Sequence, residues 1–145
     1  MDWKECNIKK LVKKIGVDNN LIKSLVKSSQ NKLESANRLK IDETTSSSVI
    51  SLCYESLREL LEALATKKGF KIYNHECYTA LLKEVLGQEE LSIRFDRFRK
   101  IRNKVNYYGK DIGIEETSSV KEEIIESINK IKQLLQNKGQ GSPNK

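Results

Sequence analysis

The apolar residues of this chain recur at spacings of three and four over most of its length, which is the pattern of amphipathic helices. The clearest case is residues 91–110, which predict one helix. Arg102 falls on the edge of its apolar face, and Gly109 offers a left-handed stop. An arginine directed toward a core needs a carboxylate, a carbonyl or a ligand, because an unpaired buried guanidinium is very costly. The apolar positions of this helix are Leu91, Phe95, Phe98, Ile101, Val105 and Tyr108.

The most apolar predicted helix is residues 46–68, which carry two adjacent apolar stripes. Such a wide apolar surface predicts a central helix, or one that also packs against another subunit. Asp42 or one of the Thr and Ser residues after it is expected to cap this helix, and Gly69 to end it. The first stripe is Val49, Cys53, Leu57, Leu60 and Leu64, and the second is Ile50, Tyr54, Leu61 and Ala65.

Four further patterns predict helices, each with a start or stop signal. The expected helices are 3–15 (ended by Gly16), 19–39 (capped by Asp18), 74–86 (capped by Asn74, ended by Gly87), and a last helix to about Asn137 that begins with a capping box of Ser119 and Glu122. The small polar residues 28–30 would let another helix approach the second of these closely.

The predicted fold is all-α: an up-and-down antiparallel helical bundle of four long helices plus two short ones. Phe70, Ile72 and Tyr73 alternate like a strand, but one strand without a partner is not stable, so residues 69–74 are expected to be a loop. Residues 1–137 are expected to form a single domain, with 3–15 as an accessory N-terminal helix. Residues 138–145 are expected to be a disordered tail.

The formal net charge of the 145-residue chain is +7, which fits nucleic acid or another polyanion as partner and also favours solubility. No apolar run is long enough for a membrane span, and the first residues do not form a signal peptide. A cytoplasmic protein is therefore expected. The lysines of residues 9–14 could contact phosphate, although a solvated face is the preferred interpretation.

The cysteines and the single histidine do not predict a metal site. Cys6, Cys53 and Cys77 are odd in number, widely spaced and outside any C-x-x-C motif, so buried free thiols are expected rather than a disulfide framework. His75 follows Asn74 at a helix start, where a capping or packing role is preferred to that of a general base. Nucleotide-loop, zinc-protease and calcium-loop motifs are absent from the sequence, and no cofactor is expected.

Arg102 and Asn106 project together from one helix, with Tyr107 and Tyr108 at its end. Arginine recognises phosphate with a planar pair of donors, and asparagine or tyrosine can orient a water or a ribose hydroxyl. Basic residues mixed with aromatic ones are typical of an RNA surface. The alternative, which the sequence leaves open, is that Arg102 pairs with a carboxylate of a neighbouring helix and only orders the bundle. The carboxylates considered are Glu34, Glu55 and Glu59.

The stretch R-N-K-V-N-Y-Y-G (102–109) resembles the arginine–polar–x3–histidine signature of the HEPN domains, the "higher eukaryote and prokaryote nucleotide-binding" family. A second stretch, 57–76, resembles the second bundle helix of these domains, its glycine turn and the start of the next element. Arg102 matches the signature arginine and Asn103 the polar position, whereas the signature histidine falls on Tyr107. Tyrosine, with a reference pKa of about 10, is a poor base at neutral pH.

The resemblance implies a helical bundle that forms a homodimer, with the signature residues of both subunits lining a cleft. Many HEPN domains are metal-independent ribonucleases, often toxins paired with a nucleotidyltransferase-type antitoxin. Others bind nucleotides, nucleic acid or proteins without catalysis. The leading expectation is a HEPN-like domain that binds RNA, nucleotide or a partner protein with weak or no catalysis. The residues expected to bind are Arg99, Arg102, Asn103, Lys104 and Tyr108.

Two alternatives accompany that expectation. One is an active metal-independent ribonuclease that uses Arg102 together with Asn106 or Tyr107. The other is a purely structural protein–protein interaction module, in which the positive charge only aids solubility. RNA binding that weakens steeply with salt would favour the RNA-binding domain or the ribonuclease over the structural interaction module.

Overall fold

The structure is a computed structural model that describes residues 1–107 and 111–137, with Tyr107 described by its backbone alone. It is mostly helical, as the sequence predicts. Tyr108, Gly109 and the tail 138–145 lie outside the described residues, so the expectations placed on them are not addressed. The elements in chain order are α1 (Trp3–Ile8), β1 (Val12–Lys14), α2 (Asn19–Asn37), α3 (Ser46–Lys67), β2 (Phe70–Ile72), α4 (His75–Ala80), a π-helical turn (Leu81–Val85), α5 (Glu89–Tyr107) and α6 (Ile114–Gln136).

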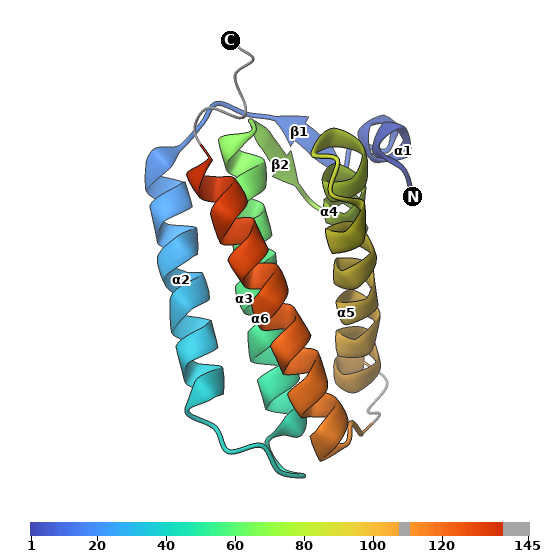
Figure 1. The fold of residues 1–145 in the computed structure, drawn as a ribbon. Helices are drawn as coiled ribbons and strands as arrows, with labels where there is room; N and C mark the ends of the chain where they lie inside the picture. The colour runs from blue at the N-terminus through green and yellow to red at the C-terminus, as the bar shows by residue number, and fades with distance from the viewer. Residues whose placement is uncertain (108–110, 138–145) are drawn as a thin grey trace.

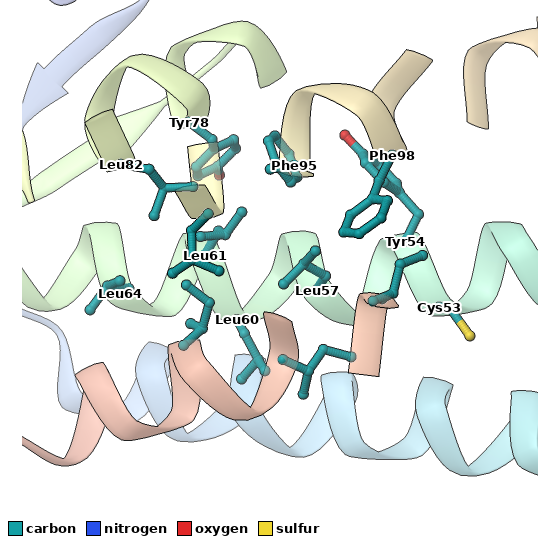
Figure 2. Packing of buried hydrophobic residues seen from close by; sticks show 14 of the residues in the cluster. Cys53, Tyr54, Leu57, Leu60, Leu61, Leu64, Tyr78, Leu82, Phe95 and Phe98 are labelled. Atoms are coloured by element: carbon teal, nitrogen blue, oxygen red, sulfur yellow. The ribbon is translucent and has the colours of Figure 1, made fainter. Parts of the chain in front are cut away.

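Helix α3 lies at the centre of the molecule, in contact with α2, α5, α6 and β2 (Figure 1). Both of its predicted apolar stripes are buried against these neighbours within one chain. The wide apolar surface of residues 46–68 is therefore explained by a central position, and it no longer argues for a second subunit. Figure 2 shows Leu57 and Leu61 of α3 on the side of Tyr78, Leu82 and Phe95, which come from α4, the π-helical turn and α5.

The close approach of α2 to α3 depends on two small serines. Ser29 Oγ donates to the carbonyl oxygen of Ser56 at 2.7 Å, and Ser56 Oγ donates to the carbonyl oxygen of Ser29 at 2.9 Å. Both serines are buried. Larger side chains would hold the helices apart, so the polar positions in the middle of α2 serve close packing, as the sequence suggests.

The helix caps are correctly predicted at two starts. Asp18 accepts from the backbone N–H of Leu21 at 3.0 Å, and Asn74 accepts from the backbone N–H of Glu76 at 2.8 Å. At the start of α3, Asp42 Oδ1 accepts from the backbone N–H groups of Thr44 and Thr45. Asp18 and Asn74 thus satisfy backbone donors that the first turn of a helix leaves without a partner, whereas Asp42 orders the turn that leads into α3, whose N-cap residue is Thr45.

The capping box predicted at Ser119 and Glu122 is wrong. Helix α6 begins earlier, at Ile114, and Ser119 is an exposed residue within it. The first turn contains Glu115 and Glu116, whose negative charges interact favourably with the N-terminal end of the helix dipole. The S-x-x-E pattern of residues 119–122 therefore lies within α6 and does not mark its start.

The N-terminal helix predicted over 3–15 is wrong beyond Ile8. Helix α1 ends there, Lys10 adopts a left-handed backbone conformation (φ 60°), and residues 12–14 form strand β1. Strand β1 pairs antiparallel with β2, with Val12 opposite Ile72. Residues 70–72 are therefore a strand and not the loop predicted for 69–74. Their partner strand lies 56 to 60 residues earlier in the chain, which is beyond the reach of local pattern reasoning.

The helix predicted over 74–86 forms, but in two parts. Residues His75–Ala80 are α-helical, and Leu81–Val85 continue as a π-helical turn. Gly87, which the sequence places after this helix, has a φ of 65°, a conformation that glycine adopts without a steric penalty. Among the described residues, no helix is long and apolar enough to cross a membrane.

The expectation of three free thiols is wrong, because Cys6 and Cys77 form a disulfide between α1 and α4. Both cysteines are fully buried, and they form a small apolar cluster with Val12 and Ala80. Only Cys53 is a buried free thiol, and burial raises its pKa to about 11. The odd number and wide spacing of the cysteines concealed a pair that meets only after the chain folds back across 71 residues.

We predict that reduction of the Cys6–Cys77 disulfide destabilises the protein by about 2–4 kcal/mol, because the bridge restricts the unfolded chain. Thermal unfolding with and without a phosphine reductant measures this effect. The matched control is the Cys6→Ala/Cys77→Ala variant, whose unfolding temperature should not respond to the reductant. Thiol labelling of the unfolded, non-reduced protein should detect Cys53 alone, and labelling of all three cysteines would contradict the disulfide.

Candidate functional site

Helices α3 and α5 are joined by a pair of polar contacts one helical turn apart. Ser51 Oγ donates to Asn106 Oδ1 at 2.8 Å, and Arg102 Nη2 donates to Glu55 Oε2 at 3.1 Å. Residues 51 and 55 are four apart on α3, as 102 and 106 are on α5, so both partners lie on one face of each helix. The inward arginine and its neighbouring asparagine thus face α3, as the pattern of α5 indicates.

Arg102 is held by a charge and by an aromatic ring at once. Its guanidinium carbon lies 5.3 Å from the centre of the Tyr54 ring, and its side chain is 16% exposed. Of the three carboxylates considered from the sequence, Glu55 is the one that pairs with it. The others have different partners: Glu34 pairs with Arg38, and Glu59 pairs with Lys32. Two attachments fix the plane of the guanidinium more firmly than an ion pair alone.

Two further arginines and two further carboxylates extend this contact along α3 and α5. Arg58 Nε donates to Glu55 at 2.8 Å and its Nη1 donates to Glu62 at 3.0 Å, while Arg99 pairs with Asp96 at 2.8 Å. We call the following set the arginine cluster: Tyr54, Glu55, Arg58, Glu62, His75, Tyr78, Asp96, Arg99 and Arg102.

The pKa shifts in the arginine cluster follow from partial burial and from its ion pairs. Burial works against the charge of Arg58, but the hydrogen bonds that it donates to Glu55 and Glu62, together with the negative charge of Glu55, raise its pKa. Burial likewise works to raise the pKa of Asp96, yet hydrogen bonds from Arg99 and Lys100 lower it on balance. Both groups are therefore charged at neutral pH, and the cluster is close to electrically balanced.

His75 belongs to the same cluster, which its position in the sequence does not reveal. As the first residue of α4 it lies beside Tyr54, whose hydroxyl is 2.9 Å from His75 Nδ1. Burial, reinforced by the positive charge of Arg58, lowers the pKa of His75, although Glu55 opposes this effect. Burial raises the pKa of Tyr54, so its phenol keeps its proton and shares a hydrogen bond with Nδ1 of the neutral imidazole, whose tautomer sets which of the two groups donates.

The remaining predicted site residues divide into three groups. Arg99 and Arg102 are brought into the arginine cluster. Asn103 is half-buried, and Lys104 and Asn106 are exposed, Asn106 with Ser51 as its partner. The side chains of Tyr107 and Tyr108 lie outside the described residues, so their predicted roles are not addressed.

The arginine cluster brings together guanidinium groups that can donate to phosphate, a neutral imidazole, and the protonated phenols of Tyr54 and Tyr78. Arginine donors suit phosphate or carboxylate oxygens, and a neutral imidazole can accept a proton. Among the described residues, no group of histidines, cysteines and carboxylates could hold a metal ion. Sequence reasoning missed the contact between Tyr54 and His75. A helix end, a strand and a turn separate these residues in the chain, so no local spacing relates them.

No family model matches the chain, and no curated protein matches it in sequence.

We predict that the stability of the protein falls as the pH drops below about 6.5, in part through His75. The pKa of His75 is lower in the folded than in the unfolded chain, so between these two values the unfolded chain binds more protons and acid favours it. The His75→Gln variant keeps an acceptor for Tyr54 but does not titrate. Its free energy of unfolding, measured by denaturant between pH 7.5 and about 5, should fall less steeply than that of the wild type, and parallel curves would contradict the assignment.

Proposed function

We propose that this chain is a HEPN-like domain that binds RNA through Arg102, with weak or no catalysis. The observation that carries the proposal is the orientation of Arg102 by Glu55 and Tyr54 at the edge of the arginine cluster. An arginine fixed in this way presents its planar donors to a phosphate at a low cost in side-chain entropy. The arginine of the R-N-K-V-N-Y-Y-G stretch thus has surroundings that suit the role the resemblance gives it.

The fold and assembly implied by the resemblance form part of the same proposal. The four long helices α2, α3, α5 and α6 would make the up-and-down bundle of that family. Two such bundles would form a homodimer with the arginine clusters facing a common cleft, and a nucleotidyltransferase-type protein would be the antitoxin of a toxin–antitoxin pair. The alternative of a structural interaction module predicts no RNA binding at all.

Binding at Arg102 would require exchange of one anion for another. The arginines of the cluster are balanced by carboxylates, so net charge at the cluster does not attract RNA. A phosphate instead competes with Glu55 for the guanidinium, and it gains from the two-pronged geometry that arginine offers. The ion pair with Glu55 is 24% exposed on the carboxylate side, so water can solvate Glu55 when a phosphate replaces it.

A second candidate function is a metal-independent ribonuclease, and His75 is the observation that favours it. The sequence offered Asn106 or Tyr107 as substitutes for the signature histidine. His75 suits the acid–base role of the signature histidine better than Asn106 or Tyr107, because its imidazole is neutral near pH 7 and Tyr54 contacts both His75 and Arg102. With Nδ1 bonded to Tyr54, Nε2 is the nitrogen that would contact a ribose hydroxyl or a leaving oxygen.

We predict that the Arg102→Gln variant binds a fluorescent single-stranded RNA about 10- to 150-fold more weakly than the wild type, because a charged hydrogen bond to phosphate is lost. Fluorescence anisotropy over a range of salt concentrations measures the affinity. The Glu55→Gln/Arg102→Gln variant, which removes both charges of this ion pair, should bind equally weakly while it folds normally, because Arg58 keeps its pair with Glu62. The matched control is Arg38→Gln, which breaks a different, exposed ion pair between Arg38 and Glu34.

Equal affinity of the wild type and both Arg102 variants would overturn the proposal. The same proteins, incubated with RNA in the presence of EDTA, test the second candidate. Cleavage that disappears in both the Arg102→Gln and the His75→Gln variants would establish the ribonuclease in place of a simple binding domain, and absence of cleavage by the wild type would exclude it.

A further inference from the structure

Part of the positive charge that carboxylates do not pair lies away from the arginine cluster, on the two-stranded ribbon of β1 and β2. In the described part of the chain, Lys13, Lys14 and Lys71 form no ion pair, whereas each arginine of the cluster does. All three lysines are exposed. The ribbon therefore presents positive charge that no carboxylate of the described residues pairs with, unlike the arginine cluster.

The register of the ribbon places two of these lysines directly opposite each other. Lys13 pairs with Lys71, between the pairs Val12–Ile72 and Lys14–Phe70. Because side chains alternate along a strand, Val12, Phe70 and Ile72 face the core while Lys13 and Lys71 share the outward face. Like charges directly opposite each other on a sheet repel, so this pair destabilises the ribbon unless an anion lies over it.

An aromatic ring extends the outward face beside the lysines. The side chain of Tyr73 is 55% exposed, and the ammonium group of Lys71 lies 5.7 Å from the centre of its ring. The backbone N–H of Tyr73 donates to the carbonyl oxygen of Leu11 at 2.9 Å, which continues the strand pairing and fixes the position of the ring. A large ring that remains this exposed on an ordered backbone is available for stacking.

The ribbon is firmly attached to the helices. The disulfide between Cys6 and Cys77 ties the segment before β1 to α4, and the Trp3 ring packs edge-on against Phe70 at 5.2 Å. In Figure 1 the ribbon lies at one end of the long helices, near the N-terminus. The outward face is thus presented in one fixed orientation, which lowers the entropy lost when a ligand binds.

We propose that the outward face of the β1–β2 ribbon, formed by Lys13, Lys71 and Tyr73, binds single-stranded nucleic acid. The two ammonium groups contact backbone phosphates, and the Tyr73 ring stacks against an unpaired base. This inference extends the RNA binding proposed for Arg102 to a second surface, but it stands on contacts of its own.

The exposed ring decides among polyanions. Base stacking on an aromatic side chain needs a base whose flat face is open, which a single strand provides and a duplex does not. An acidic peptide or an anionic vesicle would engage the lysines but would gain little from the flat face of Tyr73. Affinity that depends on both Lys71 and Tyr73 is therefore specific to a single strand.

The test is fluorescence anisotropy with a labelled oligouridylate of about 15 nucleotides, and with the corresponding DNA strand, over a range of salt concentrations. Lys71→Glu places opposite charges across the ribbon, so its unfolding temperature should equal or exceed that of the wild type. Its affinity should nevertheless fall at least about tenfold, with a smaller salt dependence. Tyr73→Ala should weaken binding about 5- to 150-fold, with the salt dependence unchanged.

The matched control is Lys27→Glu, an equal change in net charge at an exposed position of α2. Equal weakening by Lys27→Glu and Lys71→Glu would show attraction by net charge alone and would overturn this inference, whatever the Arg102 variants do. Weakening by Lys71→Glu together with normal binding by Arg102→Gln would support the ribbon and overturn the Arg102 site. The inference would also be overturned if the wild type bound no oligonucleotide. It would equally be overturned if the wild type bound phosphatidylserine vesicles, or polyglutamate, more tightly than the oligonucleotide.

Discussion

The burial of α3 on nearly all sides is the constraint on which the rest of the structure depends. From Val49 to Lys67 this helix has no fully exposed residue, so α2, α5, α6 and β2 must each cover part of it. Hydrophobic burial drives this arrangement, and the polar residues of α3 must then find partners on the covering elements. Ser56 does so with Ser29, and Glu59 does so with Ser28 and Lys32, all on α2.

The arginine cluster is the same requirement met where α4 and α5 cover α3. Glu55, Arg58 and Glu62 follow one another at spacings of three and four, so they form a charged edge along a largely buried helix. Helix α5 supplies the complementary charge through Arg102, and α4 supplies His75 to the hydroxyl of Tyr54. Packing therefore fixes the orientation of the groups on which the proposed function rests, and partial burial raises the pKa of Tyr54 and lowers that of His75.

Under the proposed function, the division of charge would give the two surfaces different tasks. At the arginine cluster, positive and negative groups balance, and recognition would depend on geometry. At the ribbon, lysines without carboxylate partners among the described residues would supply the long-range attraction that guides a polyanion toward the protein. A protein with one balanced and one unbalanced basic surface can separate attraction from precise positioning.

Local signals in the sequence were enough to predict the helical elements but not their long-range pairing. The apolar spacing of 46–68 indicated a central helix, and Asp18 and Asn74 marked two helix starts, because these features act within one or two turns. The ribbon and the Cys6–Cys77 disulfide join residues more than 50 positions apart, which no periodicity reports. For the site, the sequence indicated that Arg102 needs a partner and included Glu55 among three choices, but it gave no sign that His75 lies beside Tyr54.

The most direct test of this account is to map the surface that a single-stranded oligonucleotide contacts, using amide chemical shifts of the ¹⁵N-labelled protein. We expect the largest shifts at Lys13, Lys71 and Tyr73 of the ribbon and at Glu55 and Arg102 of the arginine cluster. Shifts confined to α2 and α6, or none at saturating oligonucleotide, would contradict the central claim that these two surfaces bind nucleic acid.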